Sequence, residues 1–397
     1  MESTYSADSV TEMMLNVTEP VVKVTSSGGR CVEGLALFRL VCEVYLATPI
    51  AVLGIFGNIL AFIVLCNHKQ KLTTTVILQA LAVADTLILA TVIPLKSLWI
   101  SSLCLDFPHD YKETWKLLFR GLFPLLFVLR MIDTWLITLL TMDRWIAVCR
   151  PLHAPRLCTR RSTYMRLCIL VLAACVFSLP RLFEHTQYGV FDTHHDVTVL
   201  NNYRWYSIGY KIILFFVFMY LVPMTLLIVL NVQLILALRV ARSGFSGRRH
   251  SQSSAITAQH RGITVIVITV VTTCVVCNLL AMVGHTFYTI QFFDRDLYTS
   301  LGDAPGFVSQ VSGVMIVINS SINFLLYTFS SKNFRQVTMK TFGCEKVCQP
   351  RYSSVPRSNN ESKMSETASY YISSQKQSNG NSKGNEIQLQ KLIKASQ

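Results

Sequence analysis

Residues 131–152 read MIDTWLITLLTMDRWIAVCRPL, a mostly apolar run with an adjacent Asp and Arg near its end. A helix needs about 20 mostly apolar residues to cross a bilayer. Seven segments of the chain meet this requirement: 40–66, 75–100, 116–146, 164–184, 206–238, 261–292 and 306–329. Because backbone polar groups cannot stay unpaired in hydrocarbon, each segment is predicted to be a helix. The sequence therefore predicts an all-α membrane protein with a seven-transmembrane helix bundle.

The composition also favours a membrane protein over the soluble classes. Charged residues make up 15% of the 397 residues, whereas a soluble domain has about 25%. The formal net charge is +14, but the basic residues lie in short loops between apolar segments, so we expect no nucleic-acid partner. The sequence contains no nucleotide-binding loop, zinc-ligand spacing or nucleophile motif in its usual context. We therefore expect that the protein is not an enzyme.

The basic loops predict the orientation of the bundle. Lys and Arg gather after the first and third segments, between the fifth and sixth, and after the seventh, so these regions are expected to be cytoplasmic. The N-terminus is then outside, and the expected location is the plasma membrane. The expected parts are an extracellular N-terminal segment (1–39), a seven-transmembrane domain (40–330), a membrane-surface helix (331–345) and a disordered cytoplasmic tail (346–397).

Three residues outside the bundle are candidates for modification. Asn16 lies in an Asn-Val-Thr sequence of the outer segment and predicts glycosylation. Cys344 and Cys348 follow the membrane-surface helix and are candidates for lipidation. The alternative for these two cysteines is a pair of ordinary reduced thiols.

Several polar side chains lie deep in the predicted helices, where a charge costs at least about 2.5–3.5 kcal/mol. They are Asn58, Asp85, Arg130, Asp133, Asn319, Ser320 and Asn323. Arg130 and Asp133 are three residues apart and therefore share one face of their helix. We expect one interior polar cluster, which is either a self-satisfied network or an ion-binding site.

Five short motifs follow one another along these helices. They are Gly57-Asn58, Leu81-Ala82-Val83-Ala84-Asp85, Asp143-Arg144-Trp145 continuing to Pro151-Leu152, Pro223, and Asn323-Phe324-Leu325-Leu326-Tyr327. Together they resemble the rhodopsin-like (class A) G-protein-coupled receptors over roughly residues 40–345. The resemblance implies that Asp143 holds Arg144 at rest and that Arg144 and Tyr327 move on activation. It also implies that Leu152 packs into the G protein.

The resemblance further implies an interior sodium site, with no other cofactor. Its residues would be Asp85, Asp133, Asn319, Ser320 and Asn323.

The sequence also departs from the family pattern. Helix 6 has Cys277-Asn278-Leu279-Leu280 where the family has Cys-Trp-x-Pro, and Phe324 stands where it has Pro. The usual outer cysteine pair is absent, and Cys31 with Cys104 is a candidate replacement disulfide.

The ligand class is narrowed first by two substitutions. Val317 stands where opsins carry the retinal-linking Lys, and Leu126 stands where amine receptors carry Asp. The stretch 177–184 resembles invertebrate FMRFamide-type neuropeptide receptors, which implies an extracellular amidated peptide as ligand. The expected pocket residues are Lys96, Phe127, Arg130, Lys211, His285, Tyr288 and Gln310.

The implied partners are a heterotrimeric G protein, and arrestin and receptor kinases through the tail. One alternative is an orphan class A receptor or one for a small molecule. A less favoured alternative is an ion-coupled transporter, because the chain shows no internal repeat.

Overall fold

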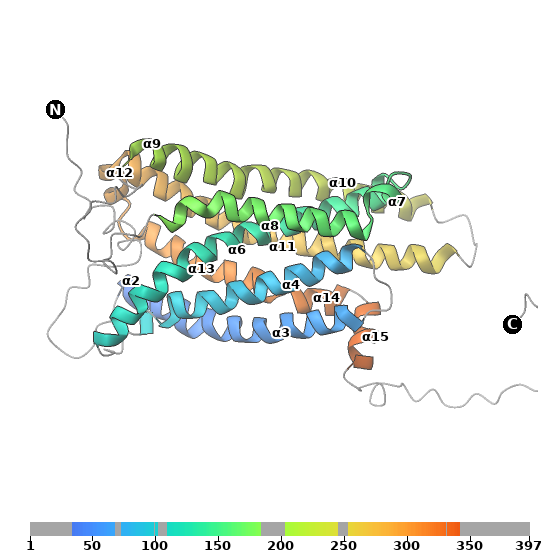
Figure 1. Ribbon diagram of the computed structural model, residues 1–397, viewed down its shortest axis with the longest axis horizontal. Coiled ribbons are helices and arrows are strands. Elements are labelled where there is room, and N and C mark those ends of the chain that lie inside the picture. The colour runs from blue at the N-terminus through green and yellow to red at the C-terminus, as the bar shows by residue number, and fades with distance from the viewer. Residues whose placement is uncertain are drawn as a thin grey trace, which may run out of the picture. The chain divides into compact units, whose positions relative to one another are not determined.

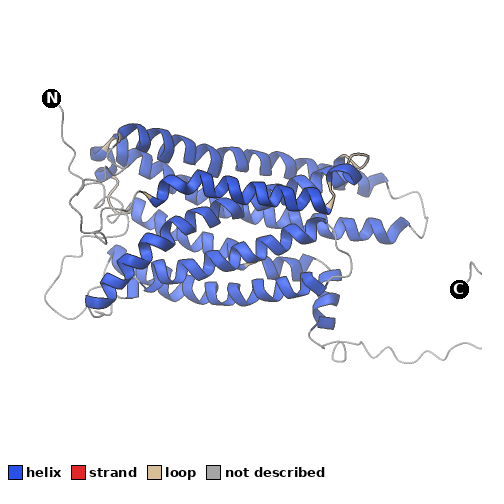
Figure 2. Ribbon diagram, viewed as in Figure 1, coloured by secondary structure: helices blue, strands red, loops and turns tan. Residues whose placement is uncertain are grey.

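The computed structural model describes residues 34–67, 73–98, 100–101, 109–183, 203–244, 253–330 and 332–341, and within these residues it contains helices and no strand. Six helical spans are long and apolar enough to cross a membrane, and a pair bent by 48° forms the seventh. The long helices run side by side (Figure 1), and nearly all of the described residues are helical (Figure 2). The predicted seven-helix bundle is confirmed.

Some spans are built from several helical pieces, including short π-helical stretches labelled η. The first comprises α2 (Gly34–Leu40), η1 (Val41–Ala47) and α3 (Thr48–Asn67). The second comprises α4 (Thr73–Val92) and η2 (Ile93–Ser97). The fifth comprises α9 (Arg204–Tyr206), η4 (Ser207–Leu214), η5 (Val217–Leu221) and α10 (Val222–Gly244). The bent seventh span comprises α13 (Ala304–Ser321) and α14 (Asn323–Ser330).

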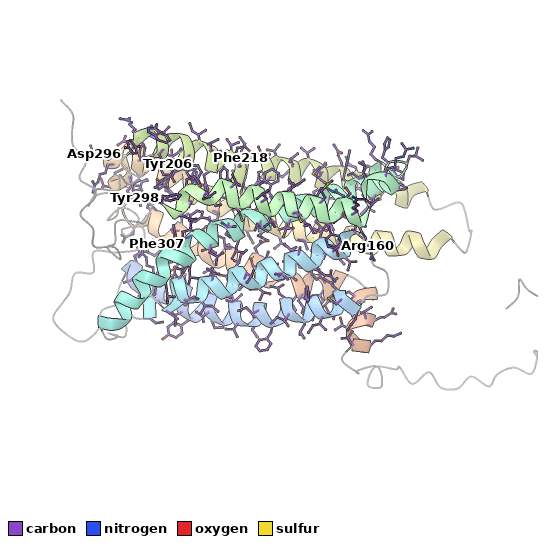
Figure 3. The ribbon with its side chains drawn as sticks, viewed as in Figure 1. Arg160, Tyr206, Phe218, Asp296, Tyr298 and Phe307 are labelled. Carbon is purple, nitrogen blue, oxygen red and sulfur yellow. The ribbon has the colours of Figure 1, made fainter. Side chains whose placement is uncertain are left out.

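The other spans are single helices. They are α6 (His109–Cys149), α8 (Arg160–Leu182) and α11 (Ser253–Phe293). Three shorter helices lie at the ends of the bundle: α7 (Ala154–Leu157), α12 (Arg295–Ser300) and α15 (Lys332–Thr341). The last falls within the stretch where a membrane-surface helix was expected. Figure 3 places Arg160 at one end of the bundle and Asp296, Tyr298 and Phe307 at the other.

The first helix begins earlier than the hydropathy of the sequence indicated. Gly34 has φ of +61°, a conformation that glycine adopts without the usual steric penalty, and α2 starts there and not at residue 40. The helix therefore includes Arg39, whose charge ended the apolar run in the sequence, although its side chain is buried in the bundle.

The first and seventh spans approach each other very closely at Gly54. A Cβ atom added to Gly54 would lie only 2.5 Å from Cβ of Ser321, at the end of α13 next to the bend. The absence of a side chain at Gly54 therefore allows α3 to pack directly against the bend.

We expect Gly54→Ala to lower the unfolding free energy by about 1–3 kcal/mol, as overpacking of a filled interior does. Thermal unfolding of the purified protein in detergent would measure the loss. The matched control is Gly284→Ala in α11, where nothing lies within 4 Å of the added atom. Equal melting temperatures for the two variants would contradict this account of the contact.

Candidate functional site

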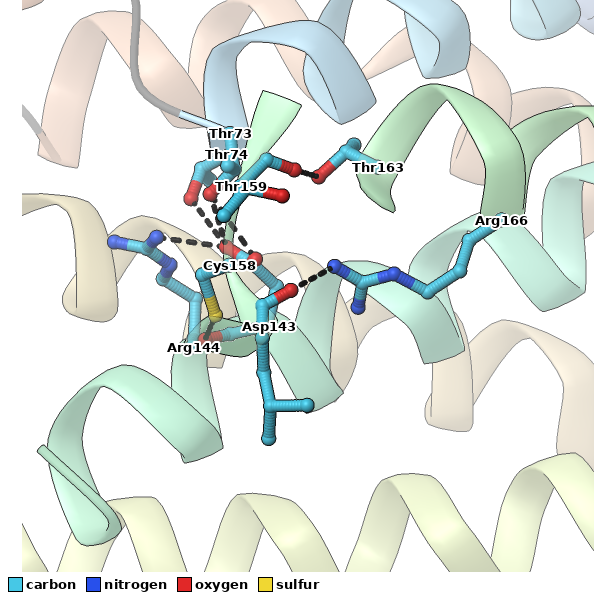
Figure 4. Close-up of polar contacts among 9 residues, drawn as sticks. Thr73, Thr74, Asp143, Arg144, Cys158, Thr159, Thr163 and Arg166 are labelled. Atoms are coloured by element: carbon cyan, nitrogen blue, oxygen red, sulfur yellow. Dashed lines mark hydrogen bonds and ion pairs between the residues drawn. The ribbon is translucent and has the colours of Figure 1, made fainter. Parts of the chain in front are cut away.

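The carboxylate of Asp143, near the end of α6, accepts hydrogen bonds from three side chains (Figure 4). Arg144 Nη2 donates to Asp143 Oδ2 at 2.7 Å, and Thr74 Oγ1 donates to the same oxygen at 2.8 Å. Thr73 Oγ1 donates to Oδ1 at 3.0 Å. Asp143 and Arg144 are 0% and 3% exposed, so this charged pair is shielded from solvent. The first turn of α4 thus fixes the carboxylate that holds Arg144.

The loop after α6 packs around this pair and presents one apolar side chain outward. Cys158 Sγ lies 3.9 Å from the carbonyl oxygen of Asp143, and burial raises the pKa of this thiol to about 11. Arg166 Nη2 donates to the carbonyl of Leu157 at 2.9 Å and ties the loop to α8. Leu152, in contrast, is 89% exposed. The surface around the Asp143–Arg144 pair therefore has an apolar side chain available for contact with another molecule.

A buried polar cluster occupies the middle of the bundle. Asn323 Nδ2 donates to Asp85 Oδ2 at 2.6 Å, and Asn58 Nδ2 donates to the carbonyl of Ser320 at 2.8 Å. These bonds join the second span to the seventh and the first to the seventh. Several buried atoms have no hydrogen-bond partner, and they include Asp85 Oδ1, both carboxylate oxygens of Asp133, Asn319 Nδ2, Ser320 Oγ and the Tyr327 hydroxyl.

Arg130 connects this cluster to the sixth span. Its Nη1 lies 3.6 Å from Asp133 Oδ2, one helical turn along α6. Its Nη2 donates to Asn278 Oδ1 of α11 at 2.9 Å. All three side chains are buried. Arg130 was expected to line the ligand pocket. In the structure its guanidinium contacts buried polar groups in the interior of the bundle.

A cluster of aromatic side chains, which we call the aromatic group, begins at Phe127, one helical turn before Arg130 on α6. It lies between the third, fourth, fifth and sixth spans. The ring of Phe215 packs against Phe127 and His285, each with a centroid distance of 5.6 Å. The guanidinium of Arg181 lies 4.3 Å from the centroid of Phe127 and 5.1 Å from that of Phe215. Tyr288 lies next to His285, at 6.1 Å between centroids.

Lys211 extends this aromatic group on the fifth span. Its ammonium lies 5.7 Å from the ring centroid of Tyr206, and the side chain is buried. Four of the seven pocket residues chosen from the sequence, namely Phe127, Lys211, His285 and Tyr288, are thus held in or beside one group.

A charged group lies on the opposite side of the bundle, between the first, second and seventh spans. Lys96 Nζ lies 3.6 Å from Glu43 Oε1. Gln310, with its amide oriented to satisfy both neighbours, donates to Glu43 and accepts from Arg39 Nε at 3.2 Å. The expected pocket is therefore divided into an aromatic part and a charged part.

The comparison with known families now separates the possible classes of protein. The model of the family described as 7 transmembrane receptor (rhodopsin family) matches residues 57–327. The chain belongs to this family. It is a multi-pass G-protein-coupled receptor and not an enzyme.

The proteins similar to this chain include several peptide receptors. The receptor is 27% identical over 338 residues to the FMRFamide peptide receptor frpr-18 of Caenorhabditis elegans, covering 82% of this chain and 74% of that protein. It is 23% identical to the FMRFamide receptor of Drosophila melanogaster, covering 76% of this chain and 54% of that protein. It is 26% identical to the somatostatin receptor type 1 of Rattus norvegicus, covering 79% and 74%.

Sequence reasoning did not select several side chains of these sites. Arg39 lies one residue before the predicted first span, and Glu43 lies inside it near its start. Asn278 was noted only as a departure from the receptor family's pattern. Its position in an apolar segment is the signal that points to a buried polar partner. Asn16, Cys31, Cys104, Cys344 and Cys348 lie outside the described residues.

Proposed function

We propose that this receptor is activated by an extracellular peptide of the FMRFamide-like amidated type. The observation that carries the proposal is the similarity, over 82% and 76% of the chain, to two proteins named as FMRFamide receptors. The likeness to a somatostatin receptor and to an allatostatin-A receptor of Bombyx mori supports the broader class of peptide ligands.

The outer half of the bundle supports an extended ligand. The aromatic group around Phe127 and His285 suits an aromatic side chain, and the cations Arg130, Arg181 and Lys211 suit carbonyl or carboxylate groups. The charged group around Lys96 lies on the other side of the bundle, with Glu43 and Gln310. A peptide that reached both groups would contact five or more helices.

The cytoplasmic end supports coupling through Asp143 and Arg144. In this proposal Arg144 leaves Asp143 on activation, Tyr327 moves inward, and the exposed Leu152 packs into the G protein. Arrestin and receptor kinases would bind through the tail.

We also propose the plasma membrane as the location, with the N-terminus outside. The proposed modifications are glycosylation at Asn16, lipidation at Cys344 and Cys348, and a disulfide between Cys31 and Cys104.

We further propose that the interior cluster binds a sodium ion at Asp85, Asp133, Asn319, Ser320 and Asn323. Three carboxylate oxygens and one hydroxyl in this cluster lack a hydrogen-bond partner, and oxygen atoms are the ligands that hard cations prefer. When both carboxyls are ionised, Asp85 and Asp133 carry two negative charges against one positive charge on Arg130. A monovalent cation would balance the remaining charge.

A panel of amidated peptides, each paired with its free-acid form, tests the ligand class. The receptor would be expressed in cells with a G-protein activation sensor, beside cells that lack the receptor. We expect activation by at least one amidated peptide and a weaker response to its free acid. Activation by small molecules alone, with silence to every peptide, would favour a small-molecule receptor and contradict the proposal.

A further inference from the structure

The sixth span lacks the features that let a membrane helix bend. α11 is continuous over 41 residues, from Ser253 to Phe293, and contains no proline. Sharp kinks in helices arise mainly at proline and at local breaks in the hydrogen-bond ladder. Because α11 has no such point over its length, its position in the bundle depends on the side chains that tie it to neighbouring helices.

One buried polar contact ties α11 to α6 at mid-depth. Arg130 Nη2 donates to Asn278 Oδ1 at 2.9 Å, with both side chains buried. A hydrogen bond with a charged donor is stronger than one between neutral groups, and a low-polarity interior strengthens it further. Most other side chains near Asn278 on α11 are apolar, so this bond differs in kind from the packing around it.

Both partners of this bond are held in position by a second contact. Asn278 Nδ2 donates to the carbonyl of Cys274 at 2.9 Å, which directs the amide oxygen toward α6. Asp133 Oδ2 lies 3.6 Å from Arg130 Nη1, which directs the guanidinium toward α11. The bond is therefore preorganised from both helices and loses little side-chain entropy when it forms.

The contact also lies between the outer pocket and the cytoplasmic pair on one helix. Phe127 is three residues before Arg130 on the same face of α6, and it packs against Phe215 and Arg181. Arg144, held by Asp143, lies further along the same helix. A displacement of the aromatic side chains, such as that of Phe127, would therefore act on Arg130 more directly than on Arg144 at the cytoplasmic end.

We propose that the Arg130–Asn278 hydrogen bond is a polar latch that holds α11 against α6 in the resting receptor and opens on activation. Arg130 and Asn278 act as positioning residues for α11, and Asp133 keeps the guanidinium in place for the latch to close again. The inference requires only that the receptor signals to a G protein, whatever its ligand.

Replacing Asn278 with leucine, which has nearly the same shape, removes the acceptor without leaving a cavity. We expect Asn278→Leu to raise ligand-independent signalling roughly tenfold, the effect of losing about one hydrogen bond to a charged group. The measurement is basal G-protein activation at matched surface density. No ligand is present, so a role of Arg130 in ligand binding does not enter the result.

A double-mutant cycle tests whether the two residues act through one bond. Arg130→Gln alone should also raise basal signalling, because the shorter side chain no longer reaches Asn278. The double variant should then signal no more than the stronger single variant, since both changes open the same contact. Effects that add independently would overturn the latch.

Matched controls remove a hydroxyl that bonds only within its own helix. Thr138 Oγ1 donates to the carbonyl of Thr134 in α6, and Thr269 Oγ1 donates to that of Val265 in α11. Thr138→Val and Thr269→Val should leave basal signalling at the parent level. A rise in these variants equal to that of Asn278→Leu would show a general loosening of the bundle and would overturn the proposal.

Two further measurements keep the test decisive if Asn278→Leu expresses poorly. Asn278→Asp retains an acceptor for Arg130 and should hold basal signalling at or below the parent level, so an increase would count against the latch. Hydrogen exchange of purified receptor should be faster along residues 264–293 in Arg130→Gln than in the parent. Because exchange needs no G protein, unchanged exchange rates refute the latch independently of coupling.

Discussion

Arg144→Ala is expected to abolish agonist-stimulated G-protein activation while the receptor still reaches the cell surface. The guanidinium is 3% exposed and is held by Asp143 at 2.7 Å, so it is a buried charge that contributes no external surface in this arrangement. If release of Arg144 creates the G-protein contact, an alanine side chain leaves nothing to release. Agonist-stimulated activation, normalised to surface density, measures the effect.

The neighbouring carboxylate gives a change in the opposite direction. Asp143→Asn keeps the shape and a hydrogen-bond acceptor for Thr74 but removes the charge that holds Arg144, so basal activation should rise. Arg150→Ala serves as control, because Arg150 is exposed and lies over the Trp145 ring, 5.6 Å from its centroid. Full signalling by Arg144→Ala would refute the role proposed for this pair.

Asp85→Asn is expected to remove the effect of sodium on agonist binding. Asp85 is 0% exposed and has one carboxylate oxygen without a hydrogen-bond partner, while the other accepts from Asn323. The amide oxygen of asparagine still accepts that bond, so the second and seventh spans stay joined. The substitution therefore removes mainly the charge that would attract a cation.

Agonist affinity in sodium chloride and in an N-methylglucamine salt of equal ionic strength measures the coupling. In the parent receptor we expect sodium to weaken agonist binding by about fivefold or more, a usual coupling between two sites. Asp85→Asn should give equal affinities in the two salts. Asp296→Asn is the control and should behave as the parent, because Asp296 is exposed in the first turn of α12. Equal sodium sensitivity in Asp85→Asn and the parent would exclude the interior ion site.

Hydropathy was sufficient to predict the seven spans, because each depends on a local run of apolar residues. The partners of the buried polar side chains depend on packing between distant segments. Asp85 and Asn323 are 238 residues apart, and their depth in the apolar segments placed them in one cluster but did not predict the hydrogen bond between them. Arg130 and Asn278 are 148 residues apart, and the family resemblance led away from their contact, since the family has tryptophan at this point of helix 6.

The start of the first span shows a different limit of sequence reasoning. Arg39 lies directly before the apolar run, so the predicted span began at residue 40. In the structure the amide of Gln310 bridges Arg39 and Glu43 by hydrogen bonds, and the charge of Glu43 faces that of Lys96 on the second span. Charges that neutralise one another across helices cannot be recognised from the hydropathy of one segment.

The unbroken course of α11 has a mechanical consequence. Asn278 lies 25 residues from the Ser253 end and 15 from the Phe293 end. At 1.5 Å per residue these arms measure about 38 and 22 Å. While the Arg130–Asn278 hydrogen bond is closed, it restrains both arms from this one point. Once the bond opens, a helix without a bend shifts as one piece, so the longer arm toward Ser253 moves together with the shorter arm toward Phe293.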